Sequence, residues 1–496
     1  MNHASAPRLG RYLSQISASG ARLEPSAAAM LAMLDHLSAA APTVAEAIAK
    51  ELRDQRDTLK LIASENASSL AVQLAQASWL TDKYAEGVPG HRFYAGCENV
   101  DAIEAEAAAL ACELFGAEHA YVQPHSGADA NLVAFLAILA TRVEAPLARE
   151  LGQTDVAKLG RDDWQRLRQA FGSQRLLALD YYAGGHLTHG YRHNLSSRLF
   201  DVHSYTVDRA TGIIDLDELR AQALRVRPLI LLAGYSAYPR RIDFARLRAI
   251  ADESGAVLMV DMAHFAGLVA GKVFTGADDP VAHADVVTTT THKTLRGPRG
   301  GLVLCRKEFA DAIDRGCPLV LGGPLPHVLA AKVVALREAG TPGFRAYAAR
   351  IVENARALAA ACGAEGLDVV TGGTDNHLLL IDVASTFGLT GRQAESAVRS
   401  CGITLNRNAL PFDTNGPWYT SGLRLGTPAI TTRGLGSEQM TAIAQLVAQT
   451  LRGTRPSPTS RAHYQLAPSV ADDVRAGVRS LTRAFPLYPE LPDDLA

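Results

Sequence analysis

One segment of the sequence combines residue types that suit amine chemistry. Residues 288–294 read TTTTHKT, follow a β-branched apolar run and precede the glycine-rich stretch Gly297–Gly301. Only eight of the 49 basic residues are lysine, and Lys293 is one of them. A lysine desolvated at the end of a strand favours its neutral amine, the form that condenses with an aldehyde. We therefore interpret Lys293 as a Schiff-base residue, against the alternative of a surface lysine that reaches into solvent.

A carboxylate ends a second apolar strand. Residues Val257–Asp261 read VLMVD, and His264 follows three positions later. An acid at the carboxyl end of a parallel strand points into the crevice where open α/β sheets bind ligands. Asp261 could there keep a pyridinium nitrogen protonated, as pyridoxal phosphate requires. Taken alone, Asp261 could equally be the N-cap of the next helix.

Two further segments suit a phosphate and an aromatic ring. Ser126 and Gly127 open the most apolar helix of the chain, where free N–H groups can meet a phosphate. Residues 184–190 read GGHLTHG and place His186 and His189 on a glycine-flanked loop. A flat imidazole can stack on a pyridine ring, whereas a metal site would need further ligands that the sequence does not reveal. The four segments together predict a pyridoxal-phosphate site and no metal.

The elements that must position these residues alternate between helical periodicity and short apolar runs from about residue 110 to 305, as βαβ units do. A helix is expected at Asp243–Ser254, with Asp243 as N-cap and Gly255 beyond its end. The expected strands are Arg175–Asp180, Pro228–Ala233, Ala256–Asp261, Asp285–Thr290 and Gly301–Cys305. This pattern predicts an α/β fold with a mostly parallel sheet.

We expect three parts along the chain. An N-terminal arm or helical segment covers residues 1–60, and a large domain covers 61–325 with a charged surface insertion at 141–174. Residues 326–496 hold a linking apolar helix, Val328–Ala339, and a smaller α+β domain. The start of the chain carries Arg8, Arg11 and Arg22 before its first acid, which weakly suggests a transit peptide, but a poorly ordered arm is the preferred interpretation.

Composition excludes several classes of protein. With 48% hydrophobic and 20% charged residues and a formal charge of -2, the chain is globular and lacks the basic field of a nucleic-acid-binding protein. The six cysteines contain no CxxC pair, which favours reduced thiols in the cytoplasm. The longest apolar run, Leu132–Ala140, is much shorter than the ~20 residues that span a bilayer, so no membrane segment is expected.

Eight stretches in order along the chain resemble serine hydroxymethyltransferases, which are fold type I pyridoxal-phosphate enzymes of the aspartate-aminotransferase-like class. They are LIASEN (61–66), KYAEG (83–87), QPHSG (123–127), GGHLTHG (184–190), VDMAH (260–264), TTTTHKTLRGPRGG (288–301), GGTDNH (372–377) and SGLRLGTPA (421–429). The resemblance implies a large domain with a mostly parallel sheet and a smaller C-terminal domain.

The resemblance also implies roles for individual residues. Lys293 would carry the cofactor, Asp261 would meet its pyridine nitrogen, and His186 would stack on its ring. Ser236 and His264 would lie near its phenolic oxygen. The phosphate would be held by Ser126, Gly127 and His292, joined from a partner subunit by Tyr84 and the backbone at Gly322.

The substrates have their own implied residues. Arg424, assisted by Ser64, would grip the serine carboxylate, for which a planar guanidinium is well suited. Glu86 and Tyr94 of the neighbouring chain would handle the serine hydroxyl and proton transfers. The implied tetrahydrofolate contacts are Gly185, Leu187, Asn406, Gly416, Pro417 and Trp418.

Three features depart from the family pattern. Tyr181 stands where leucine is common and Phe93 where tyrosine is usual, which affects the expected pterin contacts. Leu319-Val320-Leu321 replaces most of a glycine-rich run before Gly322, so the partner's phosphate contact is expected to differ.

The resemblance predicts a cytoplasmic transferase that interconverts L-serine plus tetrahydrofolate with glycine plus 5,10-methylenetetrahydrofolate through an external aldimine of pyridoxal 5′-phosphate. It implies a homodimer with shared active sites, and a tetramer is compatible with it. Two alternatives stay open at this point. One is a folate-independent aldolase acting on β-hydroxy amino acids such as threonine, and the other is a non-catalytic binding protein on the same fold.

Overall fold

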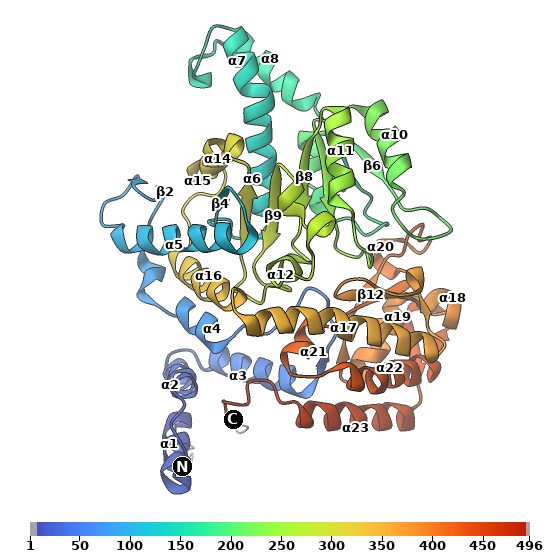
Figure 1. The fold of residues 1–496 in the computed structure, drawn as a ribbon. Helices are drawn as coiled ribbons and strands as arrows, with labels where there is room; N and C mark the ends of the chain where they lie inside the picture. The colour runs from blue at the N-terminus through green and yellow to red at the C-terminus, as the bar shows by residue number, and fades with distance from the viewer. Residues whose placement is uncertain (1–6, 493–496) are drawn as a thin grey trace.

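A seven-stranded sheet forms the centre of the larger unit in the computed structural model, which describes residues 7–492 (Figure 1). In spatial order its strands are β4 (His119–Tyr121), β10 (Gly301–Cys305), β9 (Val286–Thr290), β8 (Val257–Asp261), β7 (Ile230–Gly234), β5 (Arg175–Leu179) and β6 (Asp201–Tyr205). The strands from β9 to β6 are parallel, and β10 is antiparallel to both of its neighbours. The predicted mostly parallel sheet is confirmed, and each of the five predicted strands is present with ends shifted by at most two residues.

Both faces of this sheet are buried, which explains its nearly continuous apolar strands. Leu177, Leu231 and Leu258 point into one core. The alternate residues of the same strands point into a second core on the other face, against α6 (Gly127–Leu139). On the first face lies α11 (Phe244–Ser254), which is capped by Asp243 and ends at the left-handed Gly255 as predicted.

The helix that begins with α6 also meets the length and composition of a membrane span. The continuous helical stretch Gly127–Glu150 is the one such segment in the described part of the chain. Its first half is core: Val133, Phe135 and Ile138 are buried against the sheet. Beyond a π-helical turn at Ala140–Glu144, the chain forms α7 (Ala145–Glu150) and α8 (Arg161–Gly172), which project from the sheet (Figure 1). The predicted surface insertion is therefore mainly helical.

The smaller unit is built on an antiparallel sheet and has its own core. Its strands, in spatial order, are β11 (Asp368–Val369), β12 (Leu378–Asp382), β15 (Gly422–Gly426) and β14 (Asn406–Asn408). The helices α19 (Gly391–Ser400), α22 (Ser437–Arg452) and α23 (Pro468–Ala484) belong to this unit. Linking helices α16 (Pro326–Ala339) and α17 (Pro342–Ala364) connect it to the larger unit (Figure 1).

The segment near residue 60 also joins the smaller unit. Strand β1 (Leu59–Lys60) pairs with β13 (Ile403–Thr404), so Leu59 and Leu61 are buried in the smaller core. This pairing brings the LIASEN stretch beside the end of β15, because the amide of Gly426 donates to the carbonyl of Leu61.

The N-terminal region differs from the expectation of a poorly ordered arm. From Arg8 onward it forms α1 (Arg8–Ser19), α2 (Pro25–Ala40) and α3 (Pro42–Asp57). Tyr12 and Leu31 pack in a small cluster there, and the amides of Arg8 and Leu9 donate to Asp35. The prediction of poor order is wrong for these residues because α1 has an apolar face that packs on α2. The part of that prediction that falls on residues 1–6 lies outside the described residues.

Candidate active site

The proposed Schiff-base lysine follows strand β9 at the carboxyl edge of the sheet. Thr288, Thr289 and Thr290 in that strand are buried, and Lys293 lies in the loop just beyond it. Burial lowers the pKa of Lys293 to about 8; the positive charges of Arg424 and Arg299 add to this effect, and Asp261 opposes it. Within the described residues its amine has no hydrogen bond and no ion pair. The amine of Lys293 is therefore partly uncharged near neutral pH and has no partner among the described residues.

Asp261 is buried at the end of β8 within a set of hydrogen bonds. One of its carboxylate oxygens accepts from Asn131 Nδ2 at 2.9 Å and pairs with His189 Nε2 at 3.1 Å; the other accepts from the amide of Ala263 at 3.0 Å. Burial alone would raise the pKa of Asp261, but the hydrogen bond from His189 and the electrostatic attraction of the groups around it outweigh this effect and hold this pKa well below its usual range. Asp261 is therefore a fixed negative charge.

The two histidines of the GGHLTHG loop have different tasks. His189 accepts the amide of His186 on Nδ1, so its Nε2–H donates to Asp261. His186 accepts the amide of Thr188 on Nδ1 at 3.2 Å, and burial lowers its pKa to about 4. The ring of His186 is therefore neutral and flat, which suits stacking. Nitrogen and oxygen atoms of His186, His189 and Asp261 lie within 4.8 Å of one another, but those of His189 and Asp261 already bind each other.

A buried histidine pair lies at the same edge. His264 Nδ1 is 3.0 Å from His377 Nε2, and burial keeps the pKa of both rings low, that of His377 at about 3. His377 Nδ1 is buried without a partner. An unpaired N–H there would cost more than an unpaired acceptor nitrogen, so the proton lies on His377 Nε2 and is donated to His264. His264 then carries its own proton on Nε2.

Arg424 is a buried cation without an acid. It lies on β15, is 9% exposed, and donates from Nε to Asn406 Oδ1 at 3.0 Å and from Nη1 to the carbonyl of Ser236. Burial lowers its pKa to about 10, and no carboxylate pairs with it in residues 7–492. A buried guanidinium that lacks an anion is suited to receive one from a ligand.

The predicted phosphate residues meet where α6 starts. Ser126 caps this helix, and a Cβ at Gly127 would lie 2.7 Å from the methyl group of Thr290, so glycine allows the helix to begin this close to β9. His292 accepts the amide of Gly300 at 3.4 Å, and burial lowers its pKa to about 3. The free N–H groups at the start of α6 and the neutral imidazole of His292 are thus both available to a phosphate.

Four of the six predicted folate residues line a cavity of about 430 Å³ together with His186, Ser236 and Arg424, and Gly416 and Trp418 do not. Gly185, Leu187, Asn406 and Pro417 contribute to its wall. Tyr181, one of the departures from the family pattern, also lines it. Trp418 is exposed on α20 (Gly416–Tyr419), with Arg392 and Arg407 against its ring.

Three predicted residues, Tyr84, Tyr94 and Glu86, lie together elsewhere, with both tyrosines exposed at the surface. Tyr84 and Tyr94 are 58% and 44% exposed, their rings are 4.8 Å apart, and Tyr84 donates to Glu86 at 3.4 Å. Gly323, beside Gly322, approaches this group. Among the described residues no contact joins this surface cluster to Lys293 or Arg424.

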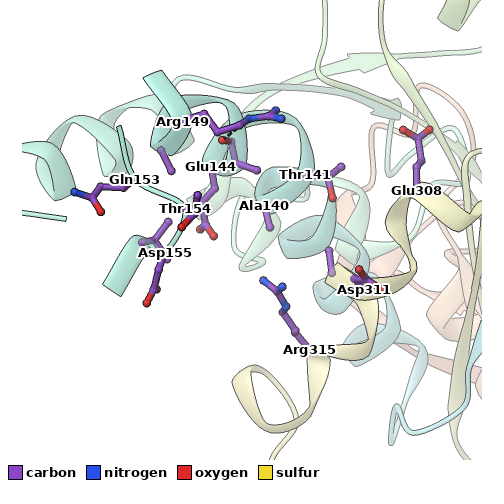
Figure 2. A pocket seen from close by; sticks show the side chains of 14 residues that line it. Ala140, Thr141, Glu144, Arg149, Gln153, Thr154, Asp155, Glu308, Asp311 and Arg315 are labelled. Carbon is purple, nitrogen blue, oxygen red and sulfur yellow. Dashed lines mark hydrogen bonds between the residues drawn. The ribbon is translucent and has the colours of Figure 1, made fainter. Parts of the chain in front are cut away.

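A further cavity of about 620 Å³ lies away from this site (Figure 2). It opens between the insertion and α14 (Lys307–Asp314), and its wall mixes Glu144 and Asp311 with Arg149 and Arg315. None of the predicted site residues lines it.

Sequence reasoning assigned no role to three polar residues of the site. Asn131 bridges Asp261 and Thr188, while His189 and His377 orient other groups. For His189 the second imidazole of the GGHLTHG loop was an available signal, and Asn131 lies one helical turn after Gly127. Nothing local to His377 indicates its partner.

An amine after one strand of a seven-stranded sheet and a carboxylate at the end of the next define the class of fold type I pyridoxal-phosphate enzymes. The chain matches the family model for serine hydroxymethyltransferase over residues 37–152 and 169–447. The unmatched residues 153–168 fall inside the predicted insertion.

Similar proteins agree with this match. The chain is 61% identical to the serine hydroxymethyltransferase of Treponema pallidum over 470 residues, covering 94% of this chain and 82% of the relative. It is 58% identical to that of Mycolicibacterium smegmatis (94% and 95% covered) and 50% identical to that of Chlamydia trachomatis serovar D (98% and 99% covered). The chain belongs to the serine hydroxymethyltransferase family. It is an enzyme of serine, glycine and folate one-carbon metabolism, and the family uses pyridoxal phosphate.

Proposed function

We propose that the chain transfers the hydroxymethyl carbon of L-serine to tetrahydrofolate, giving glycine and 5,10-methylenetetrahydrofolate, with pyridoxal 5′-phosphate attached to Lys293. The observation that carries this proposal is the placement of Lys293 and Arg424, which have N–H donors without a carboxylate partner among the described residues, at the same site as the ionised Asp261. The charges of Arg424 and Asp261 both act on the pKa of Lys293, and Arg424 lines the same cavity as His186.

The residues present fit the cofactor. A lysine with a pKa of about 8 has a useful neutral fraction at physiological pH, and Asp261 stays ionised opposite a pyridine nitrogen. The close approach at Gly127 leaves helix N–H groups open toward a phosphate. When bound, pyridoxal phosphate supplies an electron sink for the pair of electrons released at the serine Cα.

Arg424 would bind the serine carboxylate and so fix the orientation of the amino acid. Among the described residues Arg424 uses two of its hydrogen bonds, which leaves donors for a second planar group. Ser64 would assist, because its neighbour Ala63 packs directly against Gly426 at the end of β15. Holding the reacting groups in line can contribute ~7–11 kcal/mol to barrier lowering.

His264 and Ser236 would act on the oxygen side of the cofactor. With His377 fixing its tautomer, His264 holds a proton at Nε2 and can donate it in a hydrogen bond. Ser236 is held by its amide, which donates to the carbonyl of Gly184 at 2.7 Å.

Folate would bind in the 430 Å³ cavity at its Leu187 and Pro417 side, where apolar side chains can cover a flat ring. Asn406 offers an amide there. Tyr181 places an additional hydroxyl on this wall, so the pterin contacts would differ in detail from the family pattern.

A second copy of the chain would complete the site. Glu86, Tyr94 and Tyr84 lie together with both tyrosines exposed, Gly323 beside Gly322 approaches them, and among the described residues none of them contacts Lys293, as expected of residues that serve the neighbour's site. A homodimer with two shared active sites satisfies this arrangement, and a tetramer of such dimers is compatible with it. All six cysteines are free, which favours the cytoplasm.

The decisive experiment compares glycine formation from L-serine with and without tetrahydrofolate. We expect a rate increase of at least a hundredfold with folate, because the one-carbon unit then has an acceptor. Equal rates would instead identify a folate-independent aldolase, and no turnover with bound cofactor would identify a binding protein.

A further inference from the structure

A fully buried lysine, Lys332, lies beside the segments that are proposed to bind the phosphate. Lys332 on α16 is 1% exposed, and its Nζ donates to the carbonyls of Val122 at 2.5 Å, Pro124 at 3.0 Å and Gly301 at 2.8 Å. An ammonium has three N–H donors, and here all three are used. Within residues 7–492 no carboxylate forms an ion pair with Lys332, although Glu104 acts on it through its charge. This cation is therefore held by backbone dipoles alone.

The three carbonyls belong to the two segments that carry the proposed phosphate ligands. Pro124 precedes Ser126 by two residues, and the amide of Gly301 donates to the carbonyl of Pro124 at 2.9 Å. A Cβ on Gly301 would lie 2.3 Å from the carbonyl oxygen of Ser126, so the segments are in contact. On the other side, the amide of Gly300 donates to His292. The hydrogen bonds of Lys332 thus connect the segment of Ser126 to the segment of His292.

The local packing is arranged around a lysine in particular. A Cβ at Gly300 would lie 2.7 Å from Cε and 3.1 Å from Nζ of Lys332, so glycine leaves the space that the ammonium occupies. The charge also reaches the site, because Lys332 is among the positive groups that lower the pKa of His292. An apolar side chain of the same volume would leave the carbonyls of Val122, Pro124 and Gly301 without their donor, so the ammonium both holds these segments and places its charge near His292.

We propose that Lys332 is a positioning residue for the cofactor's phosphate, which fixes the segments of Ser126 and His292 and places a buried positive charge behind them. This inference rests on the proposed function. A phosphate carries up to two negative charges, and a cation in a poorly solvated interior acts on it more strongly than one in water. The contribution of Lys332 is therefore specific to the phosphate and absent for the ring of the cofactor.

The test compares two aldehydes on the full-length apoprotein: pyridoxal 5′-phosphate and pyridoxal, which lacks the phosphate. The dissociation constant of each is measured by absorbance, and their ratio isolates the contribution of the phosphate. We expect the ratio of pyridoxal to pyridoxal-phosphate Kd to fall at least tenfold in Lys332→Gln. Lys332→Arg, which keeps the charge, should retain at least a third of the wild-type ratio. Lys272→Gln is the matched control, because Lys272 also donates to a backbone carbonyl but is exposed and remote from the site.

An unchanged ratio in Lys332→Gln overturns the inference, even if both aldehydes bind more weakly. Equal weakening would show that the substitution disturbs the whole site and has no specific effect on phosphate binding. A ratio in Lys332→Arg as low as in Lys332→Gln overturns the role of the charge. If Lys332→Gln does not fold, Lys332→Met is judged by the same ratio. A wild-type protein that binds neither aldehyde would refute the proposed function itself, which is a separate outcome.

Discussion

Two lysines with lowered pKa values, the half-buried Lys293 and the fully buried Lys332, show that desolvation alone does not mark a reactive group. Burial lowers the pKa of both, to about 8 for Lys293 and about 7 for Lys332. Lys332 donates to three carbonyls, whereas the amine of Lys293 has no partner among the described residues. The difference lies in hydrogen bonds, since a satisfied cation is held in place and an unsatisfied one is available to a ligand.

Two buried arginines repeat the contrast. Burial lowers the pKa of both Arg424 and Arg433 to about 10, and they are 9% and 8% exposed. Arg433 donates to five backbone carbonyls and ties the C-terminal helix to the segment near residue 56. Arg424 makes two hydrogen bonds. Open donors thus distinguish the proposed active-site member of each pair.

The variant with the largest expected effect on activity is Lys293→Ala, which tests the difference between the two lysines. We expect turnover to fall by roughly a thousandfold or more, since the nucleophile is lost, together with the absorbance band of the attached cofactor. The fold should persist, because no hydrogen bond of the amine is removed; circular dichroism checks this. Lys332→Gln should keep the band at saturating cofactor. A retained band in Lys293→Ala would show that another lysine is the point of attachment.

The comparison of the arginines is tested by Arg424→Ala and Arg433→Ala. Arg424→Ala should raise the KM for serine roughly a hundredfold, since two charge-assisted hydrogen bonds to the carboxylate are worth about 3 kcal/mol. Arg433→Ala should instead lower Tm by several degrees, because five carbonyls lose their donor, and leave the KM for serine within about threefold of wild type. An unaltered KM in Arg424→Ala would mean that a different group binds the carboxylate.

Hybrid dimers test whether Glu86 of one subunit serves the active site of its neighbour. Lys293→Ala and Glu86→Ala subunits should each be inactive alone. Random mixing gives about half heterodimers with one intact site in two, so activity should return to about a quarter of wild type. No recovery on mixing, with heterodimers verified by mass spectrometry, would mean that each site is built from a single chain.

The sequence allowed accurate prediction of features that depend on neighbouring residues. Strands β5, β7, β8, β9 and β10 follow from apolar runs, and Lys293 and Asp261 follow from their places after two of those strands. Contacts between distant segments could not be predicted in this way. His377 is 113 residues from His264, and Lys332 is 210 from Val122, so neither partner is visible in local periodicity. The presence of a lysine within the apolar helix at 328–339 was the one feature of the sequence that could have indicated the role of Lys332.

The smallest expected effect is a pH dependence, and it separates the two lysines directly. Attachment of pyridoxal needs the neutral amine, so its rate should rise about tenfold per pH unit below the pKa of Lys293 and level off above about 8. Arg424 helps to lower this pKa, so in Arg424→Met the midpoint should move to higher pH. Lys332 is not among the groups that shift it, so Lys332→Gln should leave the midpoint in place. A wild-type midpoint near 10, the ordinary range for lysine, would mean that Lys293 is solvated and that open donors do not distinguish it from a surface lysine.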